Sequence, residues 1–160
     1  LIMNYLKKNP LPPRSRVMEM GCGWGLLGIY CAKNFDARVT GTDADKNVFP
    51  FLHLHAEING VKVKTEAARF ENLTVERLKK VDVLFGADVC FWDELTPVLF
   101  NLIKRARQSG VKKLIISDPS RSPFTELAKR CKDSYDDASV IARSLVRPVR
   151  ATGELLIIEP

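Results

Sequence analysis

The chain has 160 residues, of which 46% are hydrophobic and 28% are charged, and its formal net charge is +6 at pH 7. This length predicts one domain, and the composition excludes a disordered segment. No apolar run approaches the ~20 residues that a membrane-spanning helix needs, and the chain starts without a secretory signal pattern, so we expect a cytoplasmic protein.

Turn residues and changes in hydrophobic periodicity divide the chain into alternating strands and helices. In chain order we expect a helix over residues 1–8, a strand over 16–20, a helix over 26–35, a strand over 37–42, a helix over 45–59, a strand over 61–65, a brief helix over 74–80, a strand over 81–87, a helix from Leu95 to Gly110, a strand over 114–117, a helix from Ser122, and strands over 139–146 and 154–158. The chain begins with leucine rather than methionine, so we also expect that an upstream piece is missing.

This order predicts the fold class. Five β-α units give an α/β protein whose parallel sheet is covered by helices on both faces. The last two strands have no helix between them, and Pro148 and Gly153 mark a turn, which predicts an antiparallel C-terminal hairpin. We therefore expect a single doubly wound, mostly parallel, seven-stranded domain over residues 1–160, in which residues 1–13 form a lead-in helix and linker.

The distribution of basic residues, cysteines and histidines favours neither a nucleic-acid groove nor a metal site. Basic residues are scattered, which favours solvated helix and strand ends over a nucleic-acid groove. The four cysteines lack zinc-site spacing and are expected to be reduced thiols. His53 and His55 are two positions apart on an expected helix, which points their rings in different directions, so we expect no metal.

The strongest local signal is a glycine-rich loop after the first strand. Gly21, Gly23 and Gly25 occupy alternate positions between a strand and a helix. Such glycines let the backbone turn tightly and let a ligand approach closely. Ligands of open parallel sheets bind at the carboxyl ends of the strands, where this loop lies.

Two ligands compete for the loop. The stretch from Gly23 to Gly28 matches the dinucleotide fingerprint, although it begins two residues late. A pyrophosphate needs helix amides without nearby carboxylates, whereas four acids follow or end the expected strands, namely Glu19, Asp43, Asp88 and Asp118. An acidic edge favours a cationic nucleoside such as S-adenosylmethionine, with Asp43 on the ribose hydroxyls and Glu19 favouring the ammonium group.

At this point the sequence resembles a known family. V-M-E-M-G-C-G-W-G, at residues 17–25, resembles motif I of the class I S-adenosylmethionine-dependent methyltransferases, and V-T-G-T-D, at 39–43, resembles their second motif. The resemblance covers about residues 14–160 and implies a Rossmann-like seven-stranded fold. It implies a cofactor site formed by Glu19, Gly21, Cys22, Gly23, Trp24, Gly25, Asp43, Ala44, Phe70 and Ala87.

Two later motifs resemble one branch of that family. G-A-D-V-C-F-W, at 86–92, resembles the D-x-x-F/Y signature of the seven-strand protein lysine methyltransferases, and S-D-P-S-R, at 117–121, resembles a motif of these and of small-amine N-methyltransferases. The resemblance implies that Asp88 and Phe91 border the methyl-acceptor pocket, with Ala87 near the methionine moiety. Because an amine must be neutral before it attacks, we expect Asp88 to orient it and to be a candidate base, with Phe91 as an aromatic wall. The chain departs from the branch at Arg69, where an acid often precedes the aromatic residue, and in lacking the upstream segment that helps to cover the pocket.

The expected function is S-adenosylmethionine-dependent N-methylation of a protein lysine or a small amine. The alternatives are methylation of RNA or another nucleic acid, a non-catalytic cofactor-binding or interaction module, and a nicotinamide-dependent oxidoreductase. Three of the site residues also have a structural alternative: Trp24 packs the loop against a helix, Asp88 caps the next helix, and Phe91 belongs to the core. For Asp118, before Pro119, we favour the role of a turn residue.

Overall fold

The computed structural model describes residues 1–147 and 149–160 and forms one seven-stranded sheet with the strand order β3-β2-β1-β4-β5-β7-β6. The first five strands in the chain pair in parallel, and β7 is antiparallel to both β5 and β6. The elements are α1 (Ile2–Lys8), β1 (Arg16–Met20), α2 (Leu26–Phe35), β2 (Arg38–Asp43), η1 (Lys46–Val48), α3 (Phe49–Ile58), β3 (Val63–Ala67), η2 (Phe70–Asn72), α4 (Val75–Leu78), β4 (Val83–Ala87), α5 (Leu95–Gln108), β5 (Lys113–Asp118), α6 (Ser122–Ser134), β6 (Ala138–Leu145) and β7 (Ala151–Ile158).

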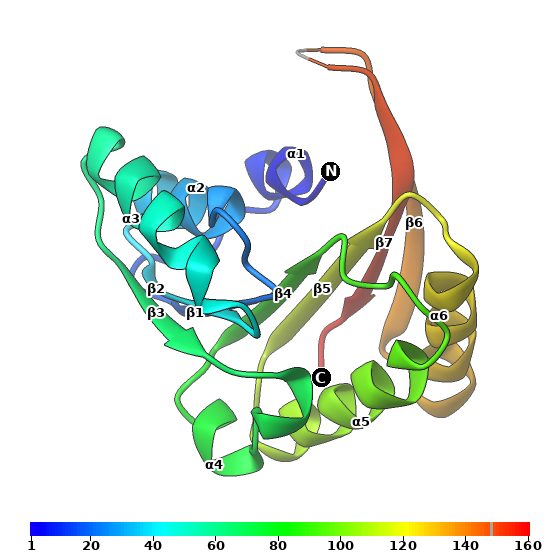
Figure 1. Ribbon diagram of the computed structural model, residues 1–160. Helices are drawn as coiled ribbons and strands as arrows, with labels where there is room; N and C mark the ends of the chain where they lie inside the picture. The colour runs from blue at the N-terminus through cyan, green and yellow to red at the C-terminus, as the bar shows by residue number, and fades with distance from the viewer. Residues whose placement is uncertain (148) are drawn as a thin grey trace.

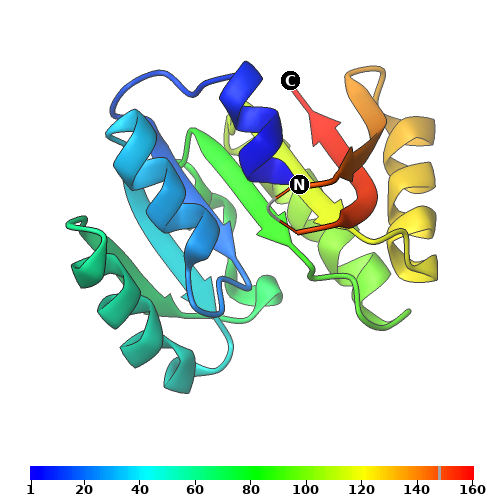
Figure 2. The same ribbon diagram turned by 90° about the horizontal axis from the view of Figure 1, so that it is seen from above.

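Helices cover the sheet from both sides, as Figures 1 and 2 show. Helices α1, α2 and α3 pack on one face, where Val17, Val39 and Phe85 belong to their apolar cluster. Helices α5 and α6 pack on the other face against a cluster that contains Met18 and Leu84. Successive residues of a strand point to opposite faces, so each inner strand supplies both clusters. No helix of the described residues is long and apolar enough to cross a membrane.

The predicted α/β class, the parallel sheet and the C-terminal antiparallel pair are confirmed. Most predicted elements also match the observed ones to within two residues. The third strand begins at Val63 rather than at residue 61, because the Val61 amide donates to the carbonyl of Ala56 and closes α3. For the same reason β4 begins at Val83: the Val81 amide donates to Leu78 at the end of α4.

The predicted helix over 45–59 and the predicted hairpin turn differ in detail from the observed structure. Asp45 caps the next helical segment, since its side chain accepts a hydrogen bond from the Asn47 amide, but the segment starts as the 3-10 turn η1 before α3. Of the two residues predicted for the hairpin turn, Pro148 lies outside the described residues, whereas Gly153 lies within β7, opposite Arg143 of β6.

Leu102 on α5 tests the contribution of the core. Its side chain is fully buried against the sheet, whereas Leu54 on α3 is half exposed. Leu102→Ala should lower the free energy of unfolding by about 2–5 kcal/mol, because the substitution removes buried methyl groups and leaves a cavity. Leu54→Ala serves as the matched control and should change it by less than about 1 kcal/mol. Equal losses in urea unfolding would contradict this packing.

Candidate functional site

The site lies where the strand order reverses. β1 is the first strand in the chain, yet it lies between β2 and β4, so the chain builds the sheet outward from β1 in both directions. Ligands of doubly wound sheets bind at this switch point, outside the carboxyl ends of the strands. The loop between β1 and α2, the end of β2 and the end of β4 meet here.

The glycine loop adopts the conformation that its sequence predicts. Gly21, Gly23 and Gly25 have φ angles of 60°, 49° and 72°, which only glycine adopts without strain. A Cβ at Gly23 would meet no atom within 4 Å, so this position faces open space. The loop therefore presents bare backbone to the exterior, as close approach of a ligand requires.

Glu19 lies beneath this loop. Its side chain is 4% exposed, and its carboxylate accepts a hydrogen bond from the Gly28 amide at 2.8 Å. A Cβ at Gly28 would lie 2.8 Å from the same oxygen, so the glycine provides the room for this contact. Burial raises the pKa of Glu19 to about 7, although the amides of Gly28 and Leu27 oppose the shift. Gly28, the third glycine of the dinucleotide-like pattern, is thus needed for the hydrogen bond that joins β1 to α2.

Asp43 ends β2 beside the open side of the loop. One carboxylate oxygen accepts a hydrogen bond from the Gly23 amide at 2.9 Å, and the other accepts one from the Asp45 amide at 3.0 Å. The side chain is half buried, and the next residue, Ala44, is exposed. Phe70 approaches the same loop, since its Cζ would lie 3.6 Å from a Cβ at Gly21. A carboxylate, an open backbone position and an aromatic ring therefore come together.

Arg121 is the residue that the sequence reasoning missed at the acidic edge. Its Nη1 lies 2.5 Å from Asp88 Oδ1 and 2.9 Å from Asp118 Oδ2. Asp118 is buried and also accepts the Arg121 backbone amide at 2.7 Å, which confirms its role as a turn residue. The predicted acidic edge is therefore partly neutralised, because the Arg121 guanidinium pairs with two of its four acids. The Asp118-x-x-Arg121 spacing carried this signal.

Asp88 and Phe91 follow β4. Asp88 has a left-handed backbone, with φ 59°, and an exposed carboxylate. It does not cap α5, which begins at Leu95. Phe91 is 48% exposed, so it is not a core residue, and the Arg121 guanidinium lies 4.6 Å from the centre of its ring. Both side chains therefore stand at the surface, beside Arg121.

Trp24 and Cys22, the other two loop residues predicted to contact the cofactor, both pack against the protein itself. Trp24 stacks on Phe51 at 5.5 Å between ring centroids and meets His55 edge-on, so it packs against α3. Cys22 is buried, and burial raises the pKa of its thiol to about 12, which leaves the thiol protonated at neutral pH. Within residues 1–147 and 149–160 no group of three or more His, Cys, Asp or Glu side chains could hold a metal ion.

The buried carboxyl of Glu19 predicts a pH-dependent stability. Its pKa of about 7 lies above the ordinary 4.5, so its contribution is present below about pH 4.5 and is lost as the pH rises to 7. The free energy of unfolding, measured with urea and compared with that of Glu19→Gln, should fall by on the order of 3 kcal/mol across this window. If the free energies of unfolding of the two proteins changed with pH in parallel, the pKa of Glu19 would not be raised in the folded state, and the prediction would be wrong.

Comparison with known proteins agrees with this geometry. A family model described as a methyltransferase domain matches residues 17–110. Phosphoethanolamine N-methyltransferase 1 of Arabidopsis thaliana is 30% identical over 127 residues, which cover 78% of this chain and 25% of the relative. The electron transfer flavoprotein beta subunit lysine methyltransferase of Xenopus laevis is 27% identical over 125 residues, which cover 78% of this chain and 50% of that protein.

A solved structure shows the same fold. The tRNA (uracil-54, C5)-methyltransferase of Pyrococcus abyssi, in complex with S-adenosyl-L-homocysteine, superimposes with a TM-score of 0.67 at 23% identity, covering 98% of this chain and 37% of that one. The chain thus spans a quarter to a half of the two curated relatives, whose names agree with the resemblance to the lysine and small-amine branch. The chain belongs to the methyltransferase domain family, as a class I S-adenosylmethionine-dependent methyltransferase.

Proposed function

We propose that this domain binds S-adenosylmethionine at the glycine loop and methylates an amine nitrogen, on a protein lysine or a small amine. The observation that carries the proposal is the position of Asp43, whose carboxylate lies beside the open backbone at Gly23. A carboxylate in this place can accept both hydroxyl groups of a ribose. The relatives named for phosphoethanolamine and for lysine support an amine as the acceptor.

The residues around Asp43 fit the cofactor. Phe70 offers an aromatic face for the adenine, and the buried Glu19 holds the start of α2, so that the loop keeps its shape. The remaining residues that we propose to border the cofactor are Gly21, Cys22, Trp24, Gly25, Ala44 and Ala87. S-adenosylmethionine, when bound, supplies a methyl group that is activated by its sulfonium. The protein has to position the acceptor and exclude water from it.

Asp88 and Phe91 carry out this positioning in our proposal. An amine must lose its proton before it attacks, and an exposed carboxylate can orient the amine and accept that proton. Arg121 fixes the Asp88 carboxylate by an ion pair and lies over the Phe91 ring, so the two residues of the acceptor site are held by one side chain. The aromatic face of Phe91 favours a group that carries positive charge.

Cofactor binding is tested with S-adenosylhomocysteine, measured by calorimetry and by thermal shift. We expect it to raise the melting temperature, whereas NAD should not, because a ligand stabilises the state that binds it. Asp43→Ala should weaken the affinity by about 1–3 kcal/mol, through loss of charged hydrogen bonds. Asp133→Ala, at an exposed acid of α6, should not change it. A shift with NAD alone would overturn the proposal.

The acceptor role is tested with Asp88→Asn. Asparagine tolerates the left-handed backbone at this position, so the substitution removes the charge without adding strain. It should leave the affinity for S-adenosylhomocysteine within a few-fold and should lower turnover by about 10²–10⁴. Turnover is followed by mass spectrometry of methylated lysine peptides and of phosphoethanolamine. Unchanged turnover would remove Asp88 from the reaction.

A further inference from the structure

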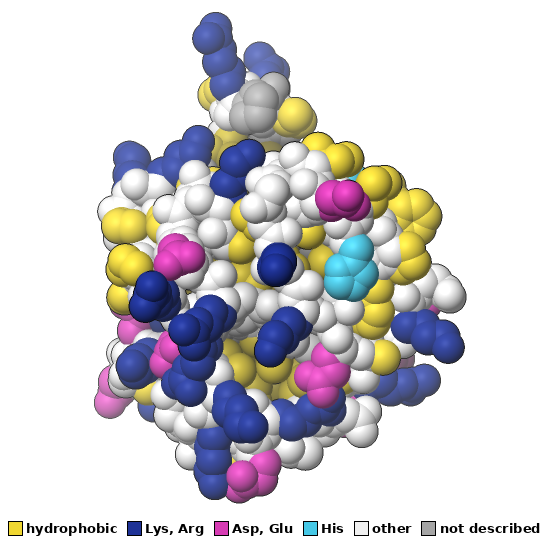
Figure 3. All heavy atoms as spheres, turned by 90° about the vertical axis from the view of Figure 1, so that its left-hand side faces the viewer, with side chains coloured by type: hydrophobic (Ala, Val, Ile, Leu, Met, Phe, Trp, Pro, Cys, Tyr) yellow, Lys and Arg dark blue, Asp and Glu magenta, His cyan; other side chains and the backbone are white. Residues whose placement is uncertain are grey.

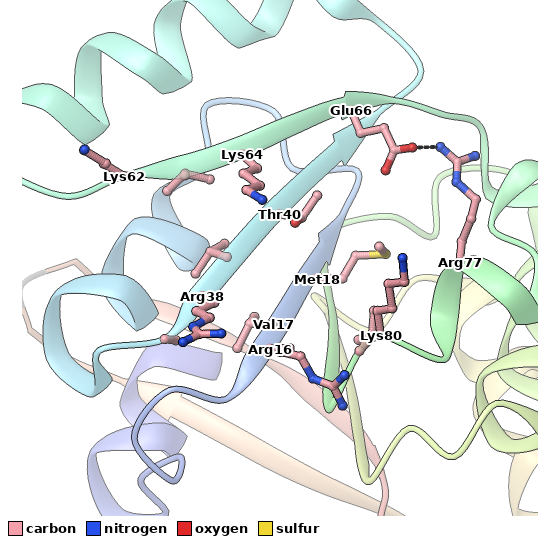
Figure 4. A pocket seen from close by; sticks show the side chains of 14 residues that line it. Arg16, Val17, Met18, Arg38, Thr40, Lys62, Lys64, Glu66, Arg77 and Lys80 are labelled. Carbon is pink, nitrogen blue, oxygen red and sulfur yellow. Dashed lines mark hydrogen bonds and ion pairs between the residues drawn. The ribbon is translucent and has the colours of Figure 1, made fainter.

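A groove of about 600 Å³ lies on the face of the sheet that carries α5 and α6, next to these two helices. It lies over β1, β2 and β3, as the close-up in Figure 4 shows. Between β3 and β4, the described chain contributes only the four residues of α4 as α-helix on this side. The helical layer on this face therefore covers β1 at Met18 but stops short of β2 and β3.

The floor of this groove consists of Thr40, the edge of the buried Met18 and the aliphatic stems of basic side chains. Lys64, Thr40 and Met18 are register partners across β3, β2 and β1, so their side chains point to the same face. Met18 is buried and Thr40 is half buried, while Lys64 is exposed. In Figure 4, Lys64 and Lys80 extend over the sheet from opposite sides, with Thr40 and Met18 between them. The groove thus has Thr40 and the edge of Met18 at its centre and cationic side chains along its walls.

The charges of the groove are strongly one-sided. Its lining includes six basic residues, Arg16, Arg38, Lys62, Lys64, Arg77 and Lys80, and a single acid, Glu66. In Figure 3, Lys and Arg side chains are frequent on the side of the molecule that faces the viewer.

Two of the six basic residues are already neutralised. Glu66 pairs with Arg77, and Asp82 pairs with Arg16. The other four form no ion pair with any described residue. The chain therefore leaves four unpaired positive charges around the floor of the groove.

We propose that this basic groove docks an acidic amphipathic helix of a partner protein. Three strands spaced ~4.8 Å apart leave a slot ~10 Å wide, about the diameter of one helix. Strands of five residues match a helix of about 11 residues in length. Its apolar stripe would pack on the Thr40 methyl group and on the aliphatic stems of the basic residues, and its flanking carboxylates would meet the four unpaired cations.

The chemistry of the lining favours a helix over a nucleic acid. Single-stranded nucleic acids bind proteins through aromatic side chains on which the bases stack, in addition to basic residues. None of the described residues that line the groove is aromatic. The aliphatic stems of the basic residues and the Thr40 methyl group can pack against the apolar face of a helix, whereas a phosphate backbone offers them no apolar surface.

The test uses fluorescence anisotropy with three labelled probes. The first is an amphipathic peptide of about 15 residues, with a leucine stripe flanked by glutamates. The second is a scrambled peptide of the same composition, and the third is a single-stranded RNA of about 20 nucleotides. The protein variants are K64E/K80E in the groove and K129E/K132E on the exposed face of α6, which change the net charge equally. Thermal melts check that each variant folds.

We expect the amphipathic peptide to bind about tenfold more tightly than the scrambled one, because only the former presents its apolar side chains together to the aliphatic stems in the groove. K64E/K80E should weaken its binding about tenfold or more, and K129E/K132E should not. Equal affinity for the two peptides would overturn the proposal, as would equal losses in the two variants. Tighter binding of the RNA, sensitive to K64E/K80E, would assign the groove to a nucleic acid instead.

Discussion

The buried hydrogen bond between the Glu19 carboxylate and the Gly28 amide is the contact on which the site depends. It joins the end of β1 to the first turn of α2 and so sets the span that the glycine loop must bridge. An acceptor at the start of a helix satisfies an amide that the helix itself leaves unpaired. The cost is the burial of a carboxyl group, which shows in its raised pKa. Stability and the geometry of the loop are therefore linked through a single side chain.

At the carboxyl ends of the strands, the negative charges of the acids are partly offset by Arg121. Glu19 is buried beneath the loop, and Arg121 pairs with both Asp88 and Asp118. Asp43 is then the acid beside the open side of Gly23. A ligand meets one carboxylate at the loop and a carboxylate–guanidinium pair beyond β4. This separation suits a nucleoside at one position and an amine at the other, as the proposed function requires.

Much of the fold could be predicted from the sequence, because each strand ends at a local signal. The three glycines after Met20 and the apolar run at the centre of β4 are features of neighbouring residues, and local patterns report them well. The pairing of Arg121 with Asp88 joins two loops 33 positions apart in the sequence, and such contacts leave little trace in local periodicity. The direction of the Glu19 side chain also depends on where α2 packs. The basic groove could not be foreseen because its cations are scattered in the sequence and are gathered only by the strand order.

The strand order also leaves β3 at an edge of the sheet, and this has a consequence for self-association. An edge strand exposes unpaired amides and carbonyls that can pair with the edge of another molecule. Lys62 and Lys64 lie just before and within β3 and are both exposed. Two copies that approached edge to edge would bring these lysines together and repel each other. The same side chains that give the groove its charge thus protect the sheet against aggregation.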